Sequence, residues 1–126
     1  MNTAILGIGS NIRPDDHIPM VKKLLLEKVD VLLETDFIQT KPLGYLEQDD
    51  FINGALLIKT DMEHEALNDW LKSLEKQLGR KPQENRNGPR PIDLDILVWN
   101  EEICDEAVVH CDFVKDFVNE LLPKKA

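Results

Sequence analysis

The chain has 126 residues, of which 42% are hydrophobic and 31% are charged, and its formal net charge is −9. This composition predicts one globular domain with a real core over residues 1–126. The acidic balance argues against nucleic acid as a partner, because phosphate backbones bind to basic faces. The apolar runs are short and no signal-peptide pattern is found, so we expect no membrane span and a cytoplasmic location.

The first half of the sequence alternates strand and helix patterns. Residues 3–8 predict a strand that ends at glycine, and residues 15–29 show apolar side chains at helical spacing after an acidic start. Residues 29–40 and 50–60 each predict a strand, and the loop between them holds Pro42.

The second half begins with a helix over residues 64–79, which places its apolar side chains on one face and ends at Gly79. A polar loop follows, then a strand over residues 92–100 and a helix over residues 112–122 that Pro123 ends. The order strand, helix, strand, strand, helix, strand is typical of α+β proteins. It predicts a ferredoxin-like βαββαβ sandwich, an antiparallel sheet with helices on one face.

The segment "GIGSNI", residues 7–12, is similar to part of a dinucleotide-binding fingerprint, since it follows a strand and leads into a helix. Ile12 stands where the third glycine of that fingerprint belongs. The sequence also lacks a phosphate loop of the Gly-Lys-Ser/Thr type. We therefore interpret this segment as a plain strand-to-helix turn.

The segment "GPRPIDLDIL", residues 88–97, places Asp93 and Asp95 two positions apart in an apolar strand, so both carboxylates point to one face. Like charges repel, and their burial without partners is costly. One interpretation is a structural cluster that arginines neutralise. The other is a Mg²⁺ site, because Mg²⁺ prefers one or two carboxylates plus substrate phosphates, with Arg90 as a fork for phosphate oxygens.

Basic residues gather in the stretch that leads to this strand: Lys72, Lys76, Arg80, Lys81, Arg86 and Arg90. They form either a solvated helix face followed by a charged loop or a local site for a small polyanion. Carboxylates for a metal beside guanidinium groups for phosphate are what phosphoryl transfer requires, since that chemistry rests on positioning and charge neutralisation.

These motifs together resemble a known family. "GPRPIDLDIL", "GIGSN", "TKPLGYLEQDDFINGAL" and "LEKQLGR" are similar to 6-hydroxymethyl-7,8-dihydropterin pyrophosphokinase, the folate-pathway enzyme that moves a pyrophosphoryl group from ATP to a pterin alcohol. The resemblance extends from Ala4 to Leu97 in the family's order. It implies an ATP- and Mg²⁺-dependent diphosphotransferase and agrees with the ferredoxin-like order of elements.

The resemblance implies roles for residues at matching positions. Asp93 and Asp95 would hold two Mg²⁺ ions that bridge the ATP phosphates, while Arg80 and Arg90 would stabilise charge on the transferring group. The residues implied at the pterin are Thr40, Pro42, Leu43, Phe51, Asn53 and Phe117, with the two phenylalanines as stacking rings. The residues implied at ATP are Lys72, Glu75, Arg86, Arg90, Ile96 and His110.

Some positions depart from the family's usual pattern. Asn87 stands where a tryptophan usually precedes Gly-Pro-Arg, and Pro82 stands where a second arginine often follows the position of Arg80. An arginine expected near Lys115 is absent as well. The resemblance thus implies a divergent member with a shortened C-terminal part, as a monomer or a homodimer. A non-catalytic relative that binds a pterin or a nucleotide and a plain ferredoxin-like interaction domain are the alternatives.

Overall fold

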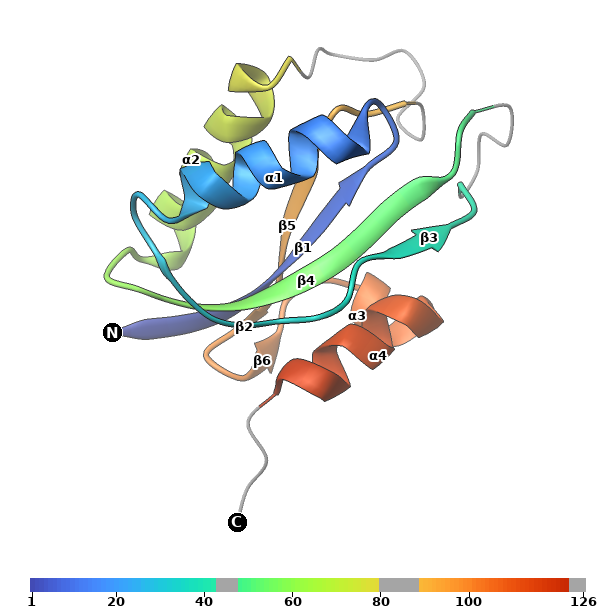
Figure 1. The fold of residues 1–126 in the computed structure, drawn as a ribbon. Coiled ribbons are helices and arrows are strands. Elements are labelled where there is room, and N and C mark those ends of the chain that lie inside the picture. The colour runs from blue at the N-terminus through green and yellow to red at the C-terminus, as the bar shows by residue number, and fades with distance from the viewer. Residues whose placement is uncertain (43–47, 80–88, 123–126) are drawn as a thin grey trace.

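The computed structural model describes residues 1–42, 48–79 and 89–122, and these parts of the chain form a six-stranded antiparallel sheet and four helices (Figure 1). The strands are β1 (Asn2–Ser10), β2 (Asp30–Glu34), β3 (Ile38–Thr40), β4 (Phe51–Thr60), β5 (Asp93–Trp99) and β6 (Glu102–Ile103). The helices are α1 (Pro14–Leu25), α2 (His64–Gln77), α3 (Ala107–His110) and α4 (Asp112–Leu121). The strand order is β2-β4-β1-β5-β6, and β3 pairs with β4 as well.

Helices cover both faces of this sheet (Figure 1). The first core lies under α1 and α2, where residues such as Val21 and Leu71 belong to one cluster with Leu6 of β1. The second core lies on the opposite face, where Val118 and Leu121 of α4 belong to one cluster with Ile5, Leu57 and Leu97. The mixed α+β class is confirmed, but the prediction that all helices lie on one face is wrong.

The burial pattern of the central strands explains this error. Ala4, Ile5 and Leu6 are consecutive in β1 and all are buried. Since successive side chains of a strand point to opposite faces, such a run requires cover on both sides of the sheet. The helix α4, which the sequence predicted without a place in the fold, supplies the second cover.

The strand predicted over residues 29–40 is interrupted at Thr35. The buried Thr35 donates its N–H to the carbonyl of Ala55 at 3.0 Å, and its Oγ1 accepts the N–H of Ala55 at 3.0 Å. Phe37 packs directly over Gly54, where an added Cβ would lie 2.7 Å from the ring. The chain therefore bends here, and β3 continues along the other half of β4, with Thr40 opposite Phe51.

The three predicted helices are confirmed within a few residues, as α1, α2 and α4. The short helix α3 and the two-residue strand β6 were not predicted, because neither is long enough to show periodicity. Across the ranges that the structure describes, the helices are too short or too polar to cross a lipid bilayer.

Candidate active site

A cavity of about 240 Å³ opens on the α4 side of the sheet, at the end of β1 that leads to α1. Its floor is formed by two glycines of β1, because Gly7 lies opposite Asp95 and Gly9 lies opposite both Asp93 and Asn53. Glycine in a strand interior weakens the strand and marks places where another group approaches the backbone closely. Here the missing side chains make room for Leu97 over Gly7 and for Asn53 over Gly9.

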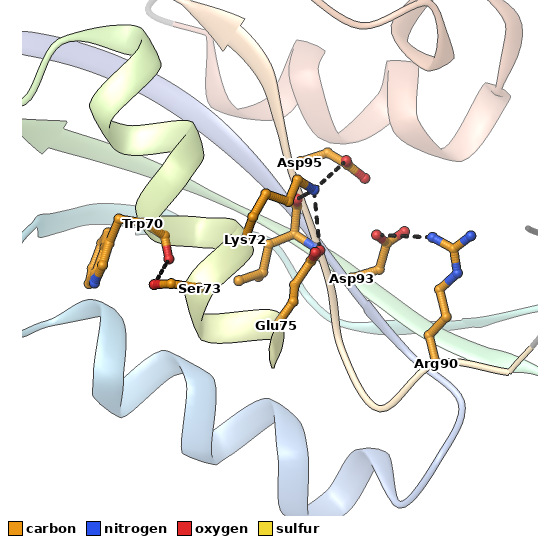
Figure 2. Close-up of polar contacts among 8 residues, drawn as sticks. Trp70, Lys72, Ser73, Glu75, Arg90, Asp93 and Asp95 are labelled. Carbon is orange, nitrogen blue, oxygen red and sulfur yellow. Dashed lines mark hydrogen bonds and ion pairs between the residues drawn. The ribbon is translucent and has the colours of Figure 1, made fainter. Parts of the chain in front are cut away.

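The acidic pair lies side by side on this floor, as the spacing in the sequence predicted. Each carboxylate has a cation beside it: Arg90 Nη1 is 3.3 Å from Asp93 Oδ1, and Lys72 Nζ is 3.6 Å from Asp95 Oδ1 (Figure 2). Arg90 and Asp93 come from the same segment, whereas Lys72 reaches over from α2. The pair is therefore partly neutralised by side chains of the protein itself.

The charge on Asp95 is nevertheless disfavoured. The pKa of this carboxyl is raised to about 6, chiefly by burial and then by the negative charge of Asp93, with smaller contributions from Asp105 and Glu75 and an opposing one from Lys72. The side chain keeps 43% of its surface exposed, so it is open to the cavity. A carboxylate held among negative neighbours is a favourable partner for a cation.

Two of the residues implied at ATP, Lys72 and Glu75, bond the peptide between the aspartates and do not belong to the lining of the cavity (Figure 2). Glu75 is 3% exposed and accepts the N–H of Leu94 at 2.7 Å. Lys72 donates to the carbonyl oxygen of Leu94 at 2.8 Å and pairs with Glu75 at 3.3 Å. These contacts fix the backbone from which both aspartates project.

Two others lie elsewhere. Ile96 is buried in the core under α1 and α2, and His110 is exposed at the end of α3, outside the lining of the cavity. Arg86 and Arg80 fall outside the described residues. The contacts with ATP implied for these positions stay predictions.

The other end of the cavity is aromatic and polar. Phe51 and Asn53 of β4 line it together with Thr40 of β3, and the amide of Asn53 donates a hydrogen bond to Thr40 Oγ1. Asn53 Oδ1 occupies the space above Gly9, where an added Cβ would lie 2.5 Å from it. Phe117 contributes to the same lining from α4. Pro42 is buried outside this lining, and Leu43 falls outside the described residues.

Several lining residues were missed by the sequence analysis. Phe113 packs edge to face with Phe117, with ring centroids 5.9 Å apart, and its spacing of four residues on a helix was a usable signal. The spacing of Gly7 and Gly9 was a signal too, since it puts both on one face of a strand. Asp105 also lines the cavity and accepts the N–H of Ala107 at 2.8 Å, but no motif marks it.

The residues present fit a Mg²⁺ ion that the protein shares with a bound substrate, and they do not fit a metal that the protein holds alone. Within residues 1–42, 48–79 and 89–122, no group of three or more His, Cys, Asp or Glu is placed to hold a metal ion. Asp93 and Asp95 supply two carboxylates on one face, and Mg²⁺ is commonly held by one or two carboxylates with substrate phosphates and water as its other ligands.

The cavity therefore combines an acidic end, suited to cations and holding one guanidinium for phosphate oxygens, with an aromatic end that carries an amide and a hydroxyl. Such a cavity offers partners for a cation, for anionic oxygens through Arg90 and for a flat ring with polar edges. The family model described as 7,8-dihydro-6-hydroxymethylpterin-pyrophosphokinase matches residues 5–123. The chain belongs to this family.

Curated relatives agree with this assignment. The 2-amino-4-hydroxy-6-hydroxymethyldihydropteridine pyrophosphokinase of Aquifex aeolicus is 37% identical over 107 residues, which are 82% of this chain and 64% of the relative. The protein of the same name from Bacillus subtilis is 36% identical, over 80% of this chain and 62% of the relative. The one from Haemophilus influenzae is 33% identical, over 82% and 66%. The chain thus spans just under two thirds of the length of these relatives.

Proposed function

We propose that this chain transfers a diphosphoryl group from ATP to 6-hydroxymethyl-7,8-dihydropterin, with Mg²⁺, in folate synthesis. The observation that carries the proposal is that one cavity brings together Asp93, Asp95 and Arg90 at one end and Phe51 and Asn53 at the other. The family match and the names of the relatives support the same reaction. The strand order β2-β4-β1-β5 supports a ferredoxin-like core.

In this proposal the pterin ring stacks on Phe51 and Phe117, and Asn53 with Thr40 recognises its polar edge. The hydroxymethyl group then points along the floor of the cavity toward the aspartates. The reaction is a direct attack of this hydroxyl on the β-phosphorus of ATP, with AMP as the leaving group, so no nucleophile from the protein is needed. The protein contributes position and charge.

At the phosphate end, Arg90 orients the transferring group and stabilises its charge, as a guanidinium fork does for phosphate oxygens. Asp93 and Asp95 are the residues that would hold two Mg²⁺ ions, which when bound neutralise charge on the phosphates. With a pKa of about 6, Asp95 is ionised at neutral pH and available as a ligand. Lys72 and Glu75 hold the peptide of Leu94 and thereby the spacing of the two carboxylates.

The test is release of AMP from ATP in the presence of Mg²⁺ and the hydroxymethyl dihydropterin. We expect AMP to form only when all three are present, and Asp95→Asn to abolish it while the fold is kept. Asp61→Asn is the matched control, because Asp61 is exposed and follows the end of β4 that is remote from the cavity. Pterin binding without AMP release would instead favour a non-catalytic relative.

A further inference from the structure

Asn11 lies just after β1 and is only 5% exposed, and its polar groups reach two segments that are distant in the sequence. Its Nδ2 donates to Gln48 Oε1 at 2.7 Å and to the carbonyl oxygen of Asp49 at 3.0 Å, 37 and 38 residues away. Its Oδ1 accepts the N–H of Arg90 at 2.7 Å, 79 residues away. Its own N–H donates to the carbonyl oxygen of Arg90 at 3.1 Å.

These two segments lead to the two ends of the cavity. Asp49 stands two residues before Phe51, where β4 begins with the aromatic and amide end of the site. Arg90 stands three residues before Asp93, and its guanidinium pairs with that carboxylate at 3.3 Å. A single buried side chain thus links the segment that precedes the proposed pterin end to the segment that carries the proposed phosphate end.

The chemistry of the link requires an amide. Asparagine offers two N–H donors and one oxygen acceptor on a short stem, and here both sides of the group are used. Aspartate keeps an acceptor for the N–H of Arg90 but turns an oxygen toward the carbonyl of Asp49, which has nothing to donate. Leucine has a similar volume and makes neither contact, so it leaves buried polar groups without partners.

We propose that Asn11 is a positioning residue that couples the two ends of the site, so that binding of one substrate orders the segment that receives the other. Asn11 does not line the cavity and is not expected to touch either substrate. The coupling of substrates rests on the proposed function, whereas the mechanical link between the two segments can be tested without any substrate.

The first measurement is peptide-level hydrogen exchange of the intact protein without ligands. In Asn11→Asp we expect faster exchange in residues 48–53 and unchanged exchange in residues 89–93, because the acceptor for Arg90 is kept. In Asn11→Leu we expect faster exchange in both segments. Asn100→Asp is the matched control, since Asn100 also follows a strand and bonds Thr3 and Asn2, but it is exposed and remote from the cavity.

The second measurement is calorimetric binding of the pterin with and without an ATP analogue that carries a methylene group in place of the α–β bridging oxygen, in Mg²⁺. We expect the analogue to tighten pterin binding by about tenfold in the wild type and in Asn100→Asp, and by less than about twofold in both Asn11 variants. Unchanged hydrogen exchange in Asn11→Leu would overturn the proposal. So would an Asn11 variant in which the ATP analogue tightens pterin binding as much as it does in the wild type. If the wild type releases no AMP, the proposed function fails, and the exchange result alone decides whether Asn11 links the segments.

Discussion

Replacing Gly9 with alanine tests how the floor of the cavity is built. The new Cβ would lie 2.5 Å from Asn53 Oδ1, too close for any real contact, while the next atom outside that side chain is 3.9 Å away on Phe51. The amide of Asn53 is the end of a flexible side chain, so it turns away and the backbone keeps its place. The hydrogen bond from Asn53 to Thr40 is lost in this movement.

The expected effects on stability and on binding differ. Loss of one hydrogen bond costs about 0.5–1.5 kcal/mol, whereas alanine in place of glycine in a strand stabilises by about 0.5–1 kcal/mol. The free energy of unfolding should therefore change by no more than about 1 kcal/mol. Pterin binding loses the polar partner that Asn53 provides, which is worth about 1–3 kcal/mol, or about 5- to 150-fold in Kd.

A double-mutant cycle separates this mechanism from general damage to the strand. The Kd of the pterin is measured for the wild type, Gly9→Ala, Asn53→Ala and the double variant, and urea unfolding is measured for each. If Gly9→Ala acts by displacing Asn53, it changes the Kd by less than about twofold when Asn53 is already alanine. An equal loss in both backgrounds, or full affinity in Gly9→Ala, would refute this reasoning.

Two further predictions concern β5 and its support. The pKa of Asp95 is about 6 in the folded chain against an ordinary value of 3.8, so the folded chain holds the proton of this carboxyl more tightly than the unfolded chain does. The stability that the protonated carboxyl contributes is present below pH 3.8 and is lost as the pH rises through about 6. In urea unfolding without Mg²⁺, the free energy of unfolding of Asp95→Asn should therefore increase relative to that of the wild type from pH 4 to pH 8. The same difference in free energy between the two proteins at both pH values would contradict the raised pKa. Glu75→Leu should lower the free energy of unfolding by about 2 kcal/mol, because it leaves the buried N–H of Leu94 without an acceptor. Glu75→Gln keeps an acceptor and should cost clearly less, and equal losses would show that the bond to Leu94 is not the cause.

Local patterns in the sequence were enough to predict most elements and the direction of the acidic pair. The spacing of Asp93 and Asp95 places them on one face of a strand whatever surrounds them. The face of the sheet that α4 covers could not be predicted from local patterns. The sequence of an amphipathic helix shows which side of the helix is buried, but not which part of the protein it packs against. The contacts of Asn11 could not be predicted either, because an asparagine in a plain turn and an asparagine that links two distant loops have the same local sequence.

Glu75 shows most clearly what a sequence pattern cannot predict. The resemblance implies a role for Glu75 at ATP, which stays a prediction, and the structure adds that this side chain accepts the N–H of Leu94, 19 positions further along the chain. A helix pattern contains no information on which backbone group a polar side chain will meet in another segment. The backbone contact of such a residue is therefore visible only in the folded chain.

The departures from ordinary strand chemistry gather at one end of one face of the sheet. Gly7 and Gly9 weaken β1 there, and Asp93 and Asp95 place like charges in β5 directly opposite them. At the other end of the same strands, Ala4 and Val98 are buried in apolar cores without exceptions of this kind. A structural ion cluster would explain the charges but not the cavity beside them, because neutralised carboxylates need no open space next to the strand. Charges and space together are what a site for a cation-bound ligand requires, and this combination favours binding over a purely structural role.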